Sequence, residues 1–245
     1  MIPEFILLAI LFLAAAALYA SVGHAGASAY LAAMALLGVT PEVMRPTALV
    51  LNLFVAAIVV ARFSRAGHLP WRSLLPLVAG SIPAAFIGSS IQISDDVYRP
   101  LVAVVLLAGA WRLATASGSD GDTPPGVPLA AGVAAGAAIG LLAGLTGTGG
   151  GIFLTPVLVL AAWTGTRDAA GLSGAFILAN SVAGLAGLTT VGFSLPAALP
   201  LWIAAVLAGG LIGSWLGAVR FSILSLRRVL AFVLVLAAAK LAFLP

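Results

Sequence analysis

The chain of 245 residues has no cysteine and few charged residues, and each shortage excludes a class of protein. Without cysteine it can form no disulfide, thiol nucleophile or cysteine-ligated metal site. Charged residues make up 7% of the chain, whereas a soluble domain carries about a quarter. Because 62% of the residues are hydrophobic, the chain needs lipid as its solvent. We therefore expect one multi-pass domain, integral to the cytoplasmic (inner) membrane, without a soluble appendage.

Carboxylates are also scarce where transport chemistry would need them. The seven acidic residues all lie at the ends of apolar runs or in loops: Glu4, Glu42, Asp95, Asp96, Asp120, Asp122 and Asp168. A carboxylate proton relay and an acidic metal site therefore have little support, and we expect neither a metal nor a cofactor. The net charge of +4 is assigned to basic loops that set orientation in the membrane, and not to a nucleic-acid surface.

Apolar runs divide the chain into two halves. They cover 5–22, 27–37, 44–61, 73–91 and 97–113, and then 129–146, 150–163, 169–190, 197–219 and 228–244. The polar stretch between them is rich in Gly, Ser, Asp and Pro, which is typical of a linker. We therefore expect a first transmembrane repeat at 1–114, a linker at 115–128 and a second repeat at 129–245. The runs at 27–37 and 150–163 are shorter than the roughly 20 residues of a full crossing.

The two halves match in order. Residues 23–26 fall on 147–150, Asn52 falls on Asn180, and Gly80 falls on Gly209. The basic loop at 62–72 has a counterpart near 190–196 without basic residues, and this reversal predicts inverted repeats. The expected fold is all-α, each repeat having a short broken or re-entrant helix pair plus three full transmembrane helices. If each pair is a hairpin, most Lys and Arg become cytoplasmic, with Arg45, Arg99 and Lys240 outside; a single broken crossing fits the charges less well.

The second half contains a dense glycine cluster at 144–151. Glycine at this density disfavours helix, so we expect unwound backbone here. At membrane depth such backbone is tolerated only where it is buried in protein or lines a cavity. A glycine loop that leads into a helix N-terminus presents N–H donors and the positive end of the helix dipole, which bind anions. Close helix packing is the alternative role for these glycines, as it is for isolated ones such as Gly132 and Gly136.

The bipartite chain, the cluster 147–151 and its weaker counterpart at 21–26 resemble the TauE/SafE sulfite exporter family over essentially the whole chain. The resemblance implies export or uptake of sulfite, thiosulfate, sulfonates or related small organic anions. The first half departs from the pattern, because Ala25 and Ala27 stand where Gly149 and Gly151 stand in the second. The first loop is therefore expected to be narrower, or to have another role.

The predicted substrate site combines both loops with nearby polar residues. Its members are Gly147, Thr148, Gly149, Gly150, Gly151, Thr146, Ser21, Gly23, His24, Gly26, Ser28, Asn52 and Asn180. The two asparagines either support the loops and the substrate or join helices by hydrogen bonds. His24 either donates to the anion or shuttles a proton, or is a structural histidine. Arg45 and Arg167 are candidates for attracting anions near run ends, against the alternative of ordinary loop charges.

We therefore predict a secondary transporter, and not an enzyme, that moves a small sulfur-containing anion by alternating access. Its partners would be the anion, lipid, and a proton as candidate coupling ion, without nucleic acid; the sequence leaves the oligomeric state open. One alternative is an intramembrane serine protease, since 171–174 spells the rhomboid-like G-x-S-G. Ser173 would then need His24 as base, in reversed chain order. The other alternative is a membrane scaffold without transport.

Overall fold

The computed structural model describes residues 3–115, 126–216 and several positions between 231 and 242. Within these residues all regular secondary structure is helical, as the sequence predicts. The helices are α1 (Glu4–Ser21), α2 (Ala27–Leu36), α3 (Pro41–Arg65), α4 (Trp71–Ser90), α5 (Asp95–Thr115), α6 (Leu129–Thr146), α7 (Gly151–Leu160), α8 (Thr166–Thr189) and α9 (Leu199–Leu216). The predicted linker at 115–128 lies almost entirely outside the described residues, and the last apolar run is described only in part.

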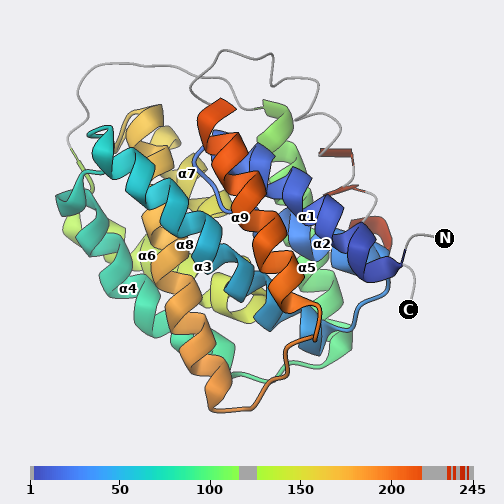
Figure 1. Ribbon diagram of the computed structural model, residues 1–245. Coiled ribbons are helices and arrows are strands. Elements are labelled where there is room, and N and C mark those ends of the chain that lie inside the picture. Colours follow the sequence, from blue (N-terminus) through green and yellow to red (C-terminus); the bar gives the residue numbers. More distant parts are fainter. Residues whose placement is uncertain are drawn as a thin grey trace.

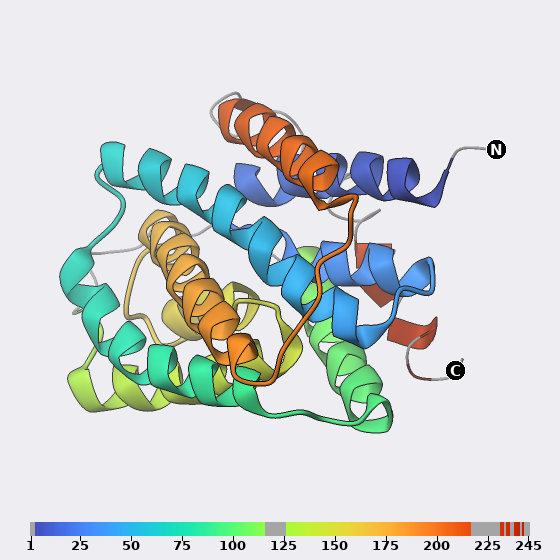
Figure 2. The same cartoon turned by 60° about the horizontal axis from the view of Figure 1, so that its bottom comes forward.

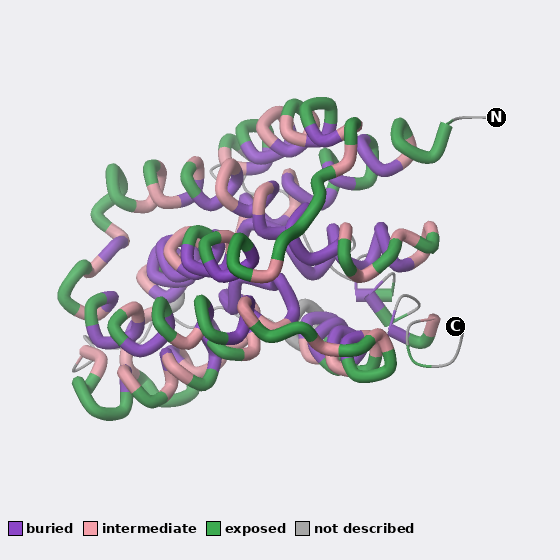
Figure 3. Tube along the Cα trace, turned by 90° about the horizontal axis from the view of Figure 1, so that it is seen from below, coloured by how far each residue is buried: buried purple, intermediate pink, exposed green. Residues whose placement is uncertain are grey.

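Among the described residues, five helices are long and apolar enough to cross a membrane, namely α1, α3, α4, α6 and α8. Large apolar side chains point outward, among them Leu75, Val104 and Leu160, where lipid is the solvent that fits them. In Figure 3 the buried residues follow the inward sides of the helices, and the exposed ones follow the outside. The predicted class, an all-α polytopic membrane fold, is confirmed.

The short helices α2 and α7 share buried clusters with their predecessors. The rings of Phe12 in α1 and Tyr30 in α2 lie 5.2 Å apart in an edge contact, and the hydroxyls of Tyr19 and Ser28 lie 2.6 Å apart. In the second half, Ile139 of α6 shares one buried cluster with Leu154 and Leu158 of α7. The contacts between α1 and α2 are those of a hairpin, whereas α6 and α7 meet at the loop that joins them, where a methyl group on Gly150 would lie 2.9 Å from Ile139.

Helix packing pairs one half of the chain with the other. Figure 2 shows α1 beside α9, α4 beside α6, and α3 with α8 between these two pairs. Along α6, Gly136 abuts Leu77 and Gly144 abuts Ala85, so α4 and α6 run parallel. In the same way, Gly209 abuts Leu13 and Gly213 abuts Ala17, so α1 and α9 run parallel. By their order in the two halves, α1 corresponds to α6 and α4 corresponds to α9. The first helix of each half therefore packs against the fourth helix of the other half (Figure 1).

The two central helices run in opposite directions. Gly171, Gly174 and Gly184 of α8 lie against Phe63, Val59 and Leu49 of α3, in that order. Since α3 and α8 occupy matching places in the two halves, this contact sets one half against the other head to tail. It defines two ends of the molecule, which we call the Arg45 face (where α3 begins) and the His68 face (where α3 ends).

Glycine in α6 allows the close approach to α4. A methyl group on Gly136, Gly140 or Gly144 would strike the backbone of Leu77, Ser81 or Ala85. The packing role considered for Gly136 is therefore the one observed, as expected for small residues at membrane helix contacts. The expectation of unwound backbone from residue 144 is wrong, because α6 continues to Thr146. Packing against α4 stabilises helix here despite its glycine content, so only residues 147–150 are unwound.

Candidate functional site

The loop at 147–150 lies between the two central helices. Gly149 has φ +72°, and a methyl group on it would lie 2.9 Å from both Asn52 Nδ2 of α3 and Ile177 Cγ2 of α8. Gly150 has φ +82°, with Ile139 and Phe176 equally close. Left-handed backbone and lack of space both require glycine here. The loop thus presents bare backbone where the two halves meet.

Asn52 and Asn180 both reach this loop, one from each side. Asn52 Nδ2 donates to Thr148 O at 3.5 Å, and Asn180 Nδ2 donates to Gly149 O at 3.4 Å. Both side chains are almost fully buried. The matched asparagines therefore converge on the second loop, and their long bonds hold it only weakly.

Three polar atoms beside Gly149 have no hydrogen-bond partner among the described residues. They are Asn52 Oδ1, Asn180 Oδ1 and Ser181 Oγ, and all three are buried. Ser181 Oγ would lie 3.4 Å from a methyl group on Gly149. Buried polar groups are normally paired, because burial without a partner is costly. Orphan groups gathered at one glycine point to a polar ligand there.

The N-terminus of helix α7 lies beside Gly149 and its loop. It begins at Gly151, directly after the left-handed Gly150. The first N–H groups of a helix have no acceptor within the helix, and the dipole makes that end positive. The site around Gly149 therefore offers two kinds of donor to an anion, backbone N–H groups and the hydroxyl of Ser181. The unpaired Oδ1 atoms of Asn52 and Asn180 are acceptors and suit a hydrogen-bond donor on the ligand, such as the O–H of a protonated oxyanion.

The first loop, at 22–26, lies elsewhere along α8. Gly23 abuts Ala170, whereas Gly149 lies at Ile177 and Ser181. Seven residues of helix, from 170 to 177, correspond to about 10 Å. Tyr30 OH donates to Ala25 O at 2.6 Å and closes the loop from inside its own hairpin. The two predicted loops are therefore neighbours along α8, each packed on the long helix of the other half.

The remaining predicted hydroxyls make local contacts. Ser21 Oγ donates to Leu18 O at 2.7 Å, and Ser28 Oγ bonds to the Tyr19 hydroxyl. Thr146 Oγ1 donates to Leu142 O at 2.7 Å and lies 2.9 Å from Thr148 Oγ1. Thr148 is thus the predicted hydroxyl that the structure places on the second loop itself.

His24 connects the first loop to the second half. Its Nε2 lies 3.0 Å from Thr155 Oγ1 of α7, and that hydroxyl lies 2.7 Å from Ser173 Oγ of α8. His24 Nδ1 lies 3.2 Å from Val22 O. A chain of polar groups therefore crosses between the halves. It includes Ser173, the serine of the G-x-S-G motif, which is fully buried. Thr155 lies between this serine and His24 and is hydrogen-bonded to both.

Arg45 is buried and hydrogen-bonded to the ends of two other helices, which its position near a run end did not predict. Its side chain is 7% exposed, and its Nε and Nη2 donate to Gly144 O and Gly88 O at 2.9 and 2.7 Å. Arg167, at the start of α8 on the opposite face, is exposed. The two arginines considered together as anion attractors thus lie at opposite ends in different surroundings.

The comparisons with known proteins give the family of the chain. The family described as Sulfite exporter TauE/SafE matches residues 7–241. The chain belongs to the TauE/SafE family. A probable membrane transporter protein, y4hK of Sinorhizobium fredii (strain NBRC 101917 / NGR234), is 39% identical over 242 residues, which cover 97% of this chain and 98% of the relative. No solved structure matches the chain.

This TauE/SafE protein is therefore a multi-pass integral membrane transporter. The family resemblance expected from the glycine motifs is confirmed, and membership leaves the protease reading without support from relatives. Ser181 and Thr155 were missed by sequence reasoning. The signal available for Ser181 was a second polar residue directly after Asn180 in an apolar run, whereas Thr155 had no signal beyond its place on a short helix.

Proposed function

We propose that this TauE/SafE protein is a secondary transporter that moves a small sulfur-containing anion, such as sulfite, thiosulfate or an organosulfonate, across the cytoplasmic membrane by alternating access. The observation that carries the proposal is the loop at 147–150, where bare backbone, the start of α7 and the unpartnered hydroxyl of Ser181 meet between the halves. Neutral donors of this kind hold an anion without trapping it against a full charge. The choice of sulfur rests on the family description.

The arrangement of the helices supports alternating access. We propose that the halves are inverted repeats, because α3 and α8 are antiparallel and equivalent helices exchange partners. At the Arg45 face, Arg45 and Tyr98 of the first half donate to Gly144 O and Thr146 O of the second. At the His68 face, His68 pairs with Asp168 at 3.0 Å. Rocking of one half on the other would break one set of bonds while keeping the other.

The distribution of basic residues supports an orientation. Arg62, Arg65 and Arg72 lie at the His68 face with Arg167, whereas Arg45 and Arg99 lie at the Arg45 face. Lys240 Nζ donates to Leu36 O at 2.9 Å, close to the start of α3. The positive-inside rule then makes the His68 face cytoplasmic.

Replacing Ser181 by alanine should weaken anion binding without weakening the fold. Its hydroxyl is buried without a partner, so removing it leaves stability unchanged or higher. Loss of one donor to the anion should raise Kd roughly tenfold or more, from about 1.5–3 kcal/mol for a hydrogen bond to a charged group. The measurement is the anion-induced melting shift of the purified protein across sulfite, thiosulfate, sulfate, methanesulfonate, acetate and phosphate.

Ser81→Ala is the matched control. Ser81 Oγ is equally buried and unpartnered, but Ser81 packs against Gly140 in the α4–α6 contact, away from the loop. It should leave every anion shift unchanged. Equal anion affinity in the Ser181 and Ser81 variants would remove Ser181 from the binding site.

We propose a proton as the coupling ion, because His24 bonds across the halves to Thr155 and histidine titrates near neutral pH. His24→Gln should abolish accumulation driven by a pH gradient in proteoliposomes but keep exchange of labelled for unlabelled anion. His68→Gln removes the other histidine, but its side-chain amide can still donate to Asp168, so this control should stay coupled. Gradient-driven accumulation by the His24 variant would refute this role.

A further inference from the structure

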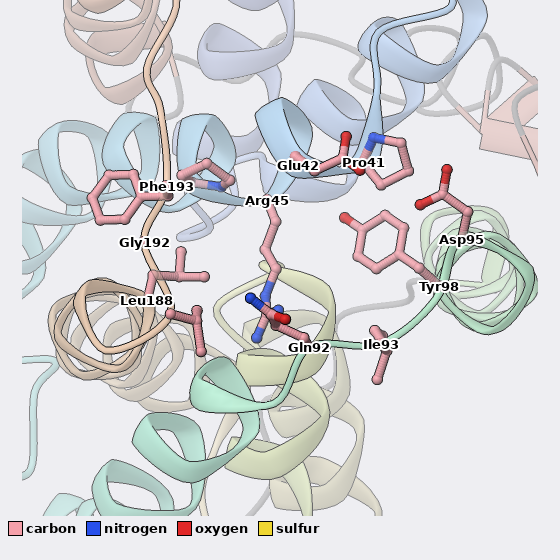
Figure 4. A pocket seen from close by; sticks show the side chains of 12 residues that line it. Pro41, Glu42, Arg45, Gln92, Ile93, Asp95, Tyr98, Leu188, Gly192 and Phe193 are labelled. Atoms are coloured by element: carbon pink, nitrogen blue, oxygen red, sulfur yellow. The ribbon is translucent and has the colours of Figure 1, made fainter.

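A cavity of about 330 Å³ opens at the Arg45 face. It lies where α3 and α5 begin and where α8 ends, and its wall includes Glu42, Gln92, Asp95, Tyr98 and Phe193 (Figure 4). Figure 4 shows the side chain of Arg45 reaching down from α3 into the middle of these residues. This cavity is not part of the anion site proposed around Gly149.

Arg45 is tied to helix ends from both halves. Besides its bonds to Gly144 O and Gly88 O, its Nη1 donates to Ile91 O at 3.3 Å. Ser89 Oγ donates to the same Gly144 O at 3.0 Å. The last carbonyl groups of a helix have no N–H partner within that helix. Because the guanidinium of Arg45 donates to such carbonyls in both α4 and α6, it joins the ends of these two helices to α3.

The same side chain lies between the cavity and the first residue of the glycine loop. A methyl group on Gly147 would lie 3.0 Å from both Arg45 Cγ and Arg45 O, so Arg45 covers the first residue of the glycine loop. Tyr98, which also lines the cavity, donates to Thr146 O at 3.1 Å. The floor of the cavity is therefore in direct contact with the start of the loop.

The floor of the cavity carries the guanidinium of Arg45, and its wall carries the carboxylates of Glu42 and Asp95. Asp95 pairs with Arg99 at 3.7 Å, and among the described residues no carboxylate forms an ion pair with Arg45. Carbonyl oxygens are the hydrogen-bond partners of the guanidinium, and an anion is a stronger acceptor than a carbonyl.

We propose that this cavity is the access path for the anion from the Arg45 face and that Arg45 is its gate. With its guanidinium on Gly144 O and Gly88 O, Arg45 closes the cavity off from Gly149 and Ser181. When the side chain leaves these carbonyls, the ends of α4 and α6 separate and the loop becomes reachable. The nature of the cargo rests on the proposed function, but the position of the gate does not.

The absence of cysteine allows a direct test by thiol labelling. Ser181→Cys places one reporter thiol behind the gate, and a charged methanethiosulfonate reagent reports its access in the purified protein without any anion. Adding Arg45→Ala should speed labelling of Cys at 181 roughly tenfold or more, the effect expected from losing a single charge-assisted hydrogen bond. Arg45→Lys, which keeps the charge but cannot span three carbonyls, should also speed it.

Matched controls separate gating from general loosening. Arg167→Ala removes an exposed arginine at the opposite end and should not speed labelling at 181. A reporter at Ser173→Cys, beside the first loop, should label no faster when Arg45 is changed. Each variant is scored only if it melts cooperatively, and if Arg45→Ala does not fold, Arg45→Lys decides.

The outcomes are distinct from those of the anion screen. Faster labelling at 181 in the Arg45 variants supports the gate, even if no anion shifts the melting temperature. Equal labelling rates with and without Arg45, in protein that labels fully after denaturation, would overturn the gate and leave anion transport untouched. Faster labelling at both 181 and 173 would also overturn it, since Arg45 would then be a general brace.

Discussion

Valine at position 149 should abolish anion binding and transport. Gly149 has φ +72°, and a Cβ atom there would lie 2.9 Å from Asn52 Nδ2 and from Ile177, with Ser181 Oγ at 3.4 Å. A β-branched side chain would therefore fill the space in front of the loop's N–H groups and push both central helices outward. We expect no anion-induced melting shift and only background uptake of labelled anion in proteoliposomes.

Gly38→Val separates this effect from backbone strain. Gly38 has φ +74°, and nothing lies within 4 Å of a methyl group placed on it. Both variants incur the cost of left-handed backbone, about 1–2 kcal/mol, but only the change at 149 enters the site. Normal anion shifts in a folded Gly149 variant would place the site elsewhere, whereas losses in both variants would point to strain.

Alanine at position 136 should cause a large loss of thermal stability. A methyl group on Gly136 would strike Leu77 O, and α6 packs along α4 through a series of such contacts. Overpacking of a rigid contact costs up to about 3 kcal/mol. With a shift of roughly 2–4 °C per kcal/mol for a domain of this size, the melting temperature should fall by roughly 6–12 °C.

Gly165→Ala is the control for this change. Gly165 precedes α8 with φ −69° and has open space around it, so alanine should leave the melting temperature close to that of the unchanged protein. Similar melting temperatures for the Gly136 and Gly165 variants would show that α4 and α6 can separate freely. The close contact would then not be what holds the halves together.

The sequence predicted the parts of the fold that depend on length and repetition. The short apolar runs after each glycine motif became the short helices α2 and α7, which have 10 residues each, fewer than the roughly 20 of a full crossing. The unwound loop at 147–150 was also predictable from its glycine density, and the matched Asn52 and Asn180 both reach it. These features depend on local chemistry, which the order of residues displays.

The contacts that make the site specific were not predictable. Helices in a membrane interior are apolar on all sides, so no amphipathic pattern tells which face of α3 meets α8. The partnership of Ser181 with Gly149, and of Thr155 with His24, depends on that rotation. Burial of Arg45 depends on the ends of α4 and α6 arriving beside it, and Gly144 is helical because α4 packs against it.

The central claim is that a small anion binds at the loop at 147–150. The most direct measurement is anomalous diffraction from crystals of the purified protein soaked in selenite, a heavier analogue of sulfite. The account predicts a selenium peak within hydrogen-bond distance of the backbone N–H groups at 149–151 and of Ser181 Oγ. Selenium found only at the first loop would contradict it. So would crystals without bound selenium, if the same protein binds selenite in solution.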